Sequence, residues 1–403
     1  MRRVAAAGLV GGLLILSMPA RAQDEGEEAA APALPDGETE ELDVRKAARL
    51  GMGPISIAPF VLVRAHANPY VGDEAFFQVG DIAENEGFRL RHGRLGVHTT
   101  YEEIARVRMS VELGSNDDGL ARVHDAFAGF TPFEWAQLLV GAQNVPFSRY
   151  ELIRSGRGAL IESPFATNAM APGHQVGVVG RGSLWDGALG YQLGVFNGLQ
   201  RGNLFYEGYE ENYAPFGNRF DGLLYTIRLS SDPLGRMPMT AADEEQGPAL
   251  LGVGANYMFS DGGARDVHTG GGDVHFKWRG MHLIAEGLWS RTVPESQPTV
   301  DGALPFEITS YTIVAEGGYM ILPRMLGLAT RFEWIDPNLQ TEDETDNWMI
   351  TGGAHFHFVD QLLKAQLEFT HREERFGLSL DNDTLTLSLQ GQLDPARPRG
   401  VER

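Results

Sequence analysis

The 403-residue sequence contains no cysteine and has only three lysines, Lys46, Lys277 and Lys364. The absence of cysteine excludes a disulfide framework, a cysteine-ligated zinc site and a cysteine nucleophile. Positive charge is also scarce, with 33 basic against 54 acidic side chains and a formal net charge of −21. Because this charge opposes the approach of a polyanion, we expect no nucleic-acid partner.

No apolar stretch of the sequence reaches the roughly 20 residues that a transmembrane helix needs. The most apolar one, residues 4–16, follows Arg2 and Arg3. It precedes Ala20 and Ala22, which stand in the small-x-small pattern that signal peptidase recognises. We therefore predict that residues 1–22 are a signal peptide that is cleaved on export. If the mature chain crosses a membrane, it must do so as a β-barrel.

Residues 23–53 contain too few apolar side chains to form a core, and nine of them are Asp or Glu. We interpret this segment as a flexible acidic extension in the periplasm. Residues 54–393 have a different, regular pattern, and residues 394–403 form a short tail. The sequence thus divides into a signal peptide, an extension, one long patterned region and a tail.

The patterned region alternates between polar and apolar residues with a period of two. Between Thr384 and Leu393, for example, polar residues occupy every even position, and leucine or glycine occupies every odd one. A β-strand sorts such positions onto two faces, whereas a helix would spread them around its axis. We count about sixteen such segments, from Ile55–His66 to Asp383–Leu393, and even strand numbers are typical of single-chain outer-membrane barrels.

The connections between these segments fall into two classes. Every second connection is short, as at Arg279-Gly280, whereas the others are mostly long, and the longest is Val145–His174. Short periplasmic turns and long external loops are typical of outer-membrane barrels, while a soluble β-sandwich does not separate its loops by length. The connection Ser231–Pro248 is an exception, because it is long on the short side. All six tryptophans also lie near predicted strand ends, as interfacial aromatic girdles require.

Four short strings in the first half of the sequence resemble one protein family. They are residues 87–97 (GFRLRHGRLGV), 140–148 (VGAQNVPFS), 161–164 (IESP) and 190–198 (GYQLGVFNG). Their order and spacing resemble the phosphate-selective porin O/P family of Gram-negative outer membranes. The strings cover about residues 86–200, and the rest of the sequence is similar to the family in architecture.

The resemblance implies an all-β transmembrane barrel of about sixteen antiparallel strands, usually a homotrimer, whose third external loop folds into the lumen. That loop corresponds to Val145–His174, which contains Arg149, Arg154 and Arg157. The implied function is that of an outer-membrane porin, surrounded by outer-membrane lipid, through which small hydrophilic solutes diffuse passively, including anions such as phosphate. The resemblance implies no cofactor and no enzymatic activity.

Strand parity places further charges on the lumenal face of the barrel. The second and third strands contribute Arg89, Arg91, Arg106 and Arg108, and a phase slip near His92-Gly93 predicts a bulge in the second strand. The late strands add both signs of charge, so we expect a mixed wall. The inward acids of these strands are Glu286, Glu316, Glu333 and Glu368.

Two interpretations of the arginines stay open. In the first, they form an anion guide that binds phosphate, sulfate or carboxylate weakly and passes it along the pore. In the second, they brace the wall against the loop, for example through Arg106 or Arg108 paired with Glu151 or Glu162.

Phosphate selectivity does not follow from the sequence. A lysine-rich phosphate-binding cluster cannot be built from three lysines, and residues 54–393 hold 43 acidic against 24 basic side chains. Acids in the outer loops would repel anions at the mouth of the pore.

Two alternatives to a porin remain, a barrel enzyme of the lipase or protease type and a structural barrel without conductance. An enzyme would need a Ser/His/Asp or Asp/His set at one rim, and no catalytic motif marks one. The histidines that qualify by sequence are His66, His124, His174 and His371.

His355 and His357 share one face of a predicted strand and are two possible metal ligands. Because no third ligand lies nearby in the sequence, we expect this pair to line the wall rather than to bind a metal.

Overall fold

The computed structural model describes residues 50–72, 86–102, 104–114, 121–153, 156–185, 187–201, 206–207, 222–262, 265–294, 307–343, 345–359, 362–377, 379 and 381–394. The predicted signal peptide, residues 23–49 of the predicted extension and residues 395–403 of the predicted tail lie outside these ranges. Within them, no helix is long and apolar enough to cross a membrane.

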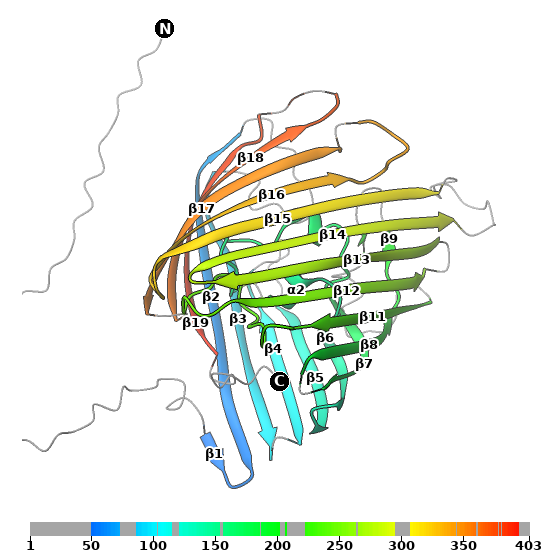
Figure 1. Ribbon diagram of the computed structural model, residues 1–403, viewed down its shortest axis with the longest axis vertical. Helices are drawn as coiled ribbons and strands as arrows, with labels where there is room; N and C mark the ends of the chain where they lie inside the picture. The colour runs from blue at the N-terminus through cyan, green and yellow to red at the C-terminus, as the bar shows by residue number, and fades with distance from the viewer. Residues whose placement is uncertain are drawn as a thin grey trace, which may run out of the picture. The chain divides into compact units, whose positions relative to one another are not determined.

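Sixteen long strands make up most of the described chain (Figure 1). They are β2 (Ile55–Val71), β3 (Gly87–Tyr101), β4 (Ala105–Glu112), β5 (Arg122–Phe133), β6 (Ala136–Asn144), β7 (His174–Leu184), β8 (Leu189–Asn197), β11 (Leu223–Ser231), β12 (Leu250–Asp261), β13 (Arg265–Trp278), β14 (Met281–Pro294), β15 (Ile308–Leu322), β16 (Leu326–Asp336), β17 (Asn347–Val359), β18 (Leu363–Glu374) and β19 (Thr384–Leu393). The short elements are β1 (Leu50–Met52), β9 (Gln200–Arg201), β10 (Tyr206–Glu207), α2 (Arg149–Leu152) and α3 (Phe165–Asn168).

The long strands close into a barrel. Each pairs in antiparallel fashion with the next long strand in the sequence, so that β8 pairs with β11. The last strand pairs with the first, from Thr384 opposite Val71 to Leu393 opposite Val61. The sixteen-stranded barrel predicted from the sequence is confirmed. Closure leaves no unpaired edge in the ring. The backbone N–H and C=O groups of the strands therefore pair with each other, because lipid offers them no hydrogen-bond partner.

The two faces of the barrel wall are inverted relative to a soluble protein. On β19, Leu387 and Leu389 are exposed, whereas Thr386, Ser388 and Gln390 are buried. A barrel in lipid presents apolar side chains outward and polar ones to the lumen, and this is why the sequence alternates with a period of two.

The two ends of the barrel differ in their connections. At one end, which we call the short-turn end, Arg279 and Gly280 join β13 to β14 with φ angles of 48° and 88°. Positive φ at both central residues is the requirement of a two-residue type I′ hairpin. Trp135, Trp185 and Trp278 are exposed at this end, as expected for an interfacial girdle. The opposite, long-loop end carries connections such as residues 72–86, 113–121 and 145–173.

Register shifts interrupt several strand pairs of the ring, and two of them insert an extra residue into β3 and into β5. The register between β2 and β3 skips Arg91, next to the slip predicted at His92-Gly93. The register between β4 and β5 skips His124, just before Asp125. A bulge breaks the alternation of faces, so neighbouring side chains can point to the same side of the sheet.

Candidate functional site

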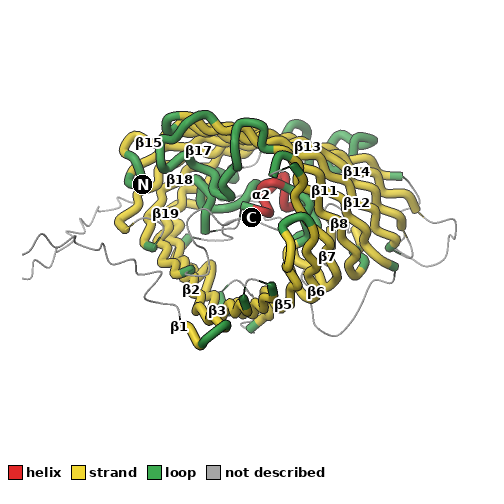
Figure 2. The backbone as a smooth tube through the Cα atoms, turned by 60° about the horizontal axis from the view of Figure 1, so that its bottom comes forward, coloured by secondary structure: helices red, strands yellow, loops and turns green. Residues whose placement is uncertain are grey.

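The connection of residues 145–173, between β6 and β7, folds back into the ring of strands. Figure 2 shows α2 inside the ring, beside β11 and β13. Side chains of this connection are buried, and Phe147 and Ala166 are 0% exposed. It is the third long connection in the sequence, so the inward third loop implied by the resemblance is confirmed. We call residues 145–173 the third loop.

One carboxylate of β14 fixes two separate turns of the third loop. Ser148 is the N-cap of α2, and its hydroxyl accepts the N–H of Tyr150 at 3.1 Å. The same hydroxyl lies 2.8 and 2.9 Å from the two carboxylate oxygens of Glu286. Glu286 also accepts the backbone N–H of Arg149 at 2.9 Å and the hydroxyl of Thr167 at 2.8 Å. The start of the loop and its second helix therefore depend on a single buried side chain.

The side chain of Arg149 is buried between the loop and the wall. Its Nε donates to Asp273 of β13 at 2.8 Å, and the other oxygen of Asp273 pairs with Arg228 of β11 at 2.7 Å. Arg228 also donates to the backbone carbonyl of Phe147 at 2.6 Å. A Cβ at Gly254 would collide with the ends of both Arg228 and Asp273, so a larger residue there would force this pair to shift. Arg149 is an anchor of the loop.

β16 holds the second helix of the loop through an acid and the segment before that helix through a base. The N–H of Ala166 donates to the carboxylate of Glu333 at 2.9 Å. Arg331 donates to the backbone carbonyl of Glu162 at 2.9 Å and to the carboxylate of Glu333 at 2.7 Å. The wall thus supplies partners to backbone groups that an irregular segment cannot satisfy by itself.

β18 does the same for the middle of the loop. The N–H of Ile161 donates to the carboxylate of Glu368. The buried ammonium group of Lys364 donates to the carbonyls of Gly158 at 3.1 Å and Gly156 at 3.4 Å. Carboxylates of the wall therefore accept loop N–H groups, and its cations donate to loop carbonyls.

The long connection of residues 232–249, at the short-turn end, also packs inside the barrel. Lys277 of β13 donates to the hydroxyl of Thr240 at 2.7 Å and to the carbonyl of Ala242 at 2.9 Å. The N–H of Ala241 donates to the carbonyl of Arg157 in the third loop at 3.1 Å. Ala241 and Ala242 belong to the same buried apolar cluster as side chains of that loop. Residues 232–249, which are unusually long for a connection at the short-turn end, are thus an inner segment that contacts the third loop.

The opposite side of the barrel, β2 to β4, presents arginines to the lumen. Three of them, Arg89, Arg91 and Arg106, are partly exposed, and the side chain of Arg91 is 19% exposed. The other three are buried. We call this set the arginine wall, and its members are Arg64, Arg89, Arg91, Arg94, Arg106 and Arg108.

Glu162 joins the third loop to the arginine wall. Arg91 binds its carboxylate with both Nε, at 2.8 Å, and Nη2, at 3.1 Å. Arg64 donates to the neighbouring carbonyl of Ile161 at 2.7 Å. Burial by itself raises the pKa of Glu162, but the charge and hydrogen bonds of Arg91, followed by the charge of Arg64, outweigh it and hold the pKa well below its usual range. Glu162 is therefore ionised at neutral pH.

Two further ion pairs lie within the wall of β3 to β5. Arg94 binds Glu112 at 3.0 Å, and Arg108 binds Asp125 at 2.8 Å. The bracing interpretation names Glu151 or Glu162 as partners of Arg108. Glu151 instead accepts the N–H of Gly173 at 2.6 Å, within the third loop. Pairing between arginines and acids is thus present on this wall, as the bracing interpretation expects, but with other partners.

The arginines proposed for the anion guide have different surroundings. Arg89, Arg91, Arg106 and Arg108 lie together on the arginine wall. Arg149 and Arg157 both belong to the third loop: the side chain of Arg149 is buried against Asp273 of the wall, and Arg157 is part-buried. Arg154 lies outside the described residues.

Sequence reasoning missed the anchoring function of the acids. Strand parity placed Glu286, Glu333 and Glu368 on the lumenal face, but it could not show that the third loop covers them. The available signal was the presence of four inward acids on the late strands together with a long loop that folds inward. A second signal was the unexplained length of residues 232–249.

His355 and His357 are buried neighbours on β17. Their ring centroids are 5.3 Å apart in an edge-to-face arrangement, and Nε2 of His355 lies 3.2 Å from Sδ of Met320. Among the residues that the structure describes, no further histidine or acid joins them in a group of three donors.

Comparisons with known proteins agree with this architecture. The sequence model of the family described as "Phosphate-selective porin O and P" matches residues 63–394. No curated protein sequence matches significantly. Three similar solved structures are OmpT of Vibrio cholerae in its trimer form, an anion-selective porin from Comamonas acidovorans and the outer-membrane channel DcaP of Acinetobacter baumannii.

Those three structures share 12%, 12% and 15% sequence identity with this chain, at TM-scores of 0.54, 0.53 and 0.53. The matches cover 84%, 84% and 85% of this chain and 99%, 100% and 99% of the other chains. At such identities the similarity supports the barrel fold alone.

Proposed function

This chain belongs to the phosphate-selective porin O and P family, and we propose that the pore it forms guides small anions along the arginine wall. The family match makes the chain an outer-membrane porin, a channel for small solutes rather than an enzyme. The barrel-enzyme and non-conducting alternatives therefore have no support.

The proposal depends on what covers the inward charges. The third loop packs against the acids of β13 to β16 and β18, and several of them accept its hydrogen bonds. Arg89, Arg91 and Arg106, in contrast, keep part of their surface exposed. The partly exposed charges of β3 and β4 are therefore arginines, whereas the inward acids of the late strands are buried. The covered acids, each 2–3% exposed, are Asp273, Glu286, Glu316, Glu333 and Glu368.

The net charge of −21 does not conflict with an anion path. Charges separated by more than the Debye length, about 8–10 Å at physiological ionic strength, are largely screened from one another. A charge that lies farther than this from an ion in the middle of the pore therefore acts on it only weakly. The guanidinium groups beside the path act at short range, where the dielectric constant is also reduced.

We propose small anions as a class, without a lysine-based preference for phosphate. Lys277 and Lys364 donate to carbonyls of the inner segment and of the third loop, and Lys46 lies outside the described residues. Arginine is thus the cation beside the path, and its planar group binds carboxylates and phosphates alike.

We further propose that the short-turn end faces the periplasm, that residues 1–22 are removed on export, and that three chains assemble. The trimer form of OmpT from Vibrio cholerae supports the last point. Cross-linking in intact outer membranes tests assembly, and a product no larger than one chain would contradict a trimer. Amino-terminal sequencing of the purified protein tests cleavage, and a start at Met1 would contradict it.

The anion guide is tested by replacing its exposed arginines. We expect the double variant Arg89→Gln, Arg106→Gln to lower the anion-to-cation permeability ratio roughly two- to fivefold. The reason is that the two substitutions remove two positive charges from the lumen, where the dielectric constant is reduced. The measurement is the reversal potential of the reconstituted protein in a planar bilayer under a KCl gradient.

The matched control is Arg291→Gln, because Arg291 is exposed and pairs with Glu307 at 2.6 Å away from the arginine wall. The control should keep the permeability ratio of the wild type. A reversal potential that is the same in the double variant and in the wild type would contradict the proposed anion guide.

A further inference from the structure

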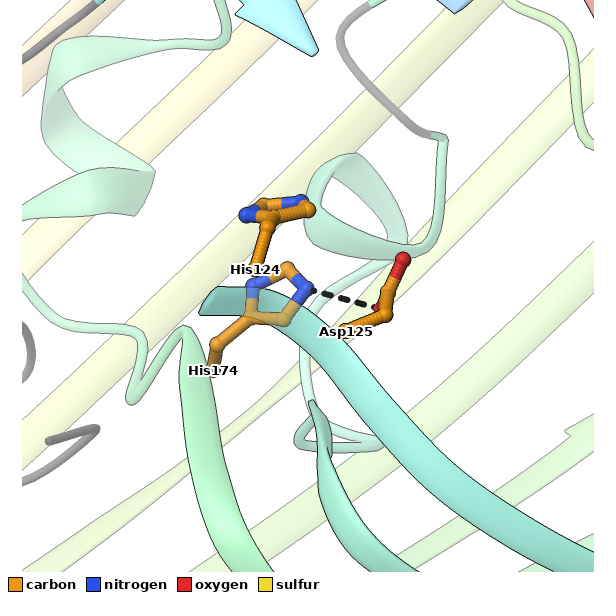
Figure 3. Close-up of side chains that lie close together, drawn as sticks. All are labelled: His124, Asp125 and His174. Carbon is orange, nitrogen blue, oxygen red and sulfur yellow. Dashed lines mark ion pairs between the residues drawn. The ribbon is translucent and has the colours of Figure 1, made fainter. Parts of the chain in front are cut away.

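A separate cluster of histidine and acid lies at the long-loop end of the barrel. His124 and Asp125 stand near the start of β5, and His174 is the first residue of β7 (Figure 3). One metal-ligating atom from each of the three lies within 4.8 Å of the other two. In the part of the chain that the structure describes, no other three histidine, aspartate or glutamate side chains meet in this way.

The bulge in β5 brings these side chains together. In a regular strand, His124 and Asp125 would point to opposite faces. Because the register with β4 skips His124, both can turn toward His174, although β6 lies between β5 and β7. The rings of His124 and His174 then lie 4.0 Å apart between centroids, inclined by 41°.

The distances within the cluster suit a common ion. Nε2 of His174 is 3.4 Å from Oδ1 of Asp125. With bonds of about 2.0–2.2 Å, two ligands of a tetrahedral zinc ion lie about 3.4 Å from each other. All three ligand atoms lie within 4.8 Å of one another, so binding of a common ion requires only a small approach of the side chains.

The other oxygen of Asp125 is held by its surroundings. Nε of Arg108 donates to Oδ2 at 2.8 Å, and the hydroxyl of Ser110 lies 3.2 Å from the same oxygen. These contacts orient Oδ1 toward His174, and outer partners of this kind commonly fix a metal-binding carboxylate.

We propose that His124, Asp125 and His174 bind a divalent transition-metal ion of the zinc class. Two imidazole nitrogens and one carboxylate oxygen suit Zn²⁺, whereas Mg²⁺ and Ca²⁺ require mostly oxygen ligands. Three protein ligands leave at least one coordination position for water or for a passing anion. Asp125 is buried but both histidines are partly exposed, so solvent can reach the site.

The neighbouring charge of Arg108 does not prevent this binding. Its positive charge opposes a cation, but it is paired with the carboxylate of Asp125. Neutral imidazole binds a transition metal through its lone pair, so the site does not require an excess of negative charge.

The test is isothermal titration of Zn²⁺ into the chelator-treated, full-length protein in detergent. We expect one zinc ion per chain at this site, with binding weakened at least tenfold in each of His124→Ala and His174→Ala. Mg²⁺ should give no heat that depends on these histidines. Heat-modifiable gel mobility shows that each variant is folded before it is titrated.

The matched control is His371→Ala. His371 pairs with Asp383 at 2.7 Å, but among the described residues it belongs to no group of three such ligands. Zinc binding should stay as in the wild type. Identical zinc isotherms for the wild type and the His124→Ala, His174→Ala double variant would overturn the site, and so would an equal loss in His371→Ala. Because binding is measured without a membrane, this result is independent of whether the pore prefers anions.

Discussion

Both sides of the barrel carry charged side chains that point inward, but these side chains are buried on one side and partly exposed on the other. On β13 to β18, inward acids and bases such as Glu286 and Arg331 are buried beneath the third loop and bind it. On β2 to β4, inward arginines such as Arg89 and Arg106 stay partly exposed. The difference lies in what covers each side, because strand alternation places both sets on the lumenal face in the same way.

Within one lumen, different side chains therefore hold the third loop and guide permeating solutes. A buried carboxylate that accepts loop N–H groups replaces the water that those groups would otherwise bind. It therefore contributes to the position of the loop and does not meet a permeating solute directly. An arginine that keeps some exposure can meet a solute directly, which is the requirement for a guide.

Removal of the Glu286 carboxylate should have the largest effect. In Glu286→Ala, the buried donors of Ser148, Arg149 and Thr167 lose their acceptor, and each unsatisfied buried donor costs about 1–3 kcal/mol. We expect the third loop to leave its place, so that single-channel conductance rises about twofold or more and the loop becomes sensitive to added protease.

Glu286→Gln serves as a second variant, because it keeps the size of the side chain and one acceptor oxygen, and it should show the same change to a smaller degree. The exposed Glu307→Ala is the matched control and should conduct like the wild type. Unchanged conductance together with a protease-resistant loop in Glu286→Ala would contradict the anchoring role.

Two acids of the third loop extend the comparison, because their surroundings shift their pKa values in opposite directions. Burial raises the pKa of Glu151 to about 8; the N–H of Gly173 counteracts this and the charge of Glu286 adds to it. Glu162, against the arginine wall, has its pKa held below the usual range. One loop thus carries a carboxyl group that is protonated at neutral pH and one that is ionised.

The raised pKa of Glu151 predicts an intermediate, pH-dependent effect. A raised folded-state pKa means that the contribution to stability is complete below the ordinary carboxyl pKa and is lost as the pH rises through about 8. Local opening of the loop near Gly173 should therefore increase by about five- to tenfold between pH 7 and pH 9. Amide hydrogen exchange measures this, relative to Glu151→Gln, which cannot ionise and should lack the extra increase. Equal pH profiles in the two proteins would rule out the effect.

Much of the barrel could be predicted from the sequence, because lipid outside and water inside impose a period of two on every strand. Residues 384–393 show this pattern without interruption, and they form β19. The third loop could be located by its length. The slip at His92-Gly93 also indicated the bulge at Arg91, since it interrupts an otherwise regular alternation.

The contacts inside the lumen could not be predicted in the same way. Period two places Glu286 inward, but only the packed loop decides that its partners are Ser148 and Thr167. The bulge at His124 leaves no clear phase slip in the sequence, so its association with His174 across β6 was not foreseen. The extra length of residues 232–249 was visible, but not its inward direction.

The smallest expected effect concerns the charge that the loop places on the arginine wall. In Glu162→Gln, Arg91 and Arg64 lose a counter-charge, so the anion-to-cation permeability ratio should rise about twofold. Because the pKa of Glu162 is lowered, the contribution of its ionised form is present above the ordinary carboxyl pKa and is lost only when the pH falls through the lower, folded-state value. The wild-type ratio should therefore be the same at pH 7 and pH 5, and reversal potentials at both pH values measure it. Drift of the wild type toward the Glu162→Gln value at pH 5 would show that the arginine wall does not keep this carboxylate ionised, and the contrast between the two loop acids would then be lost.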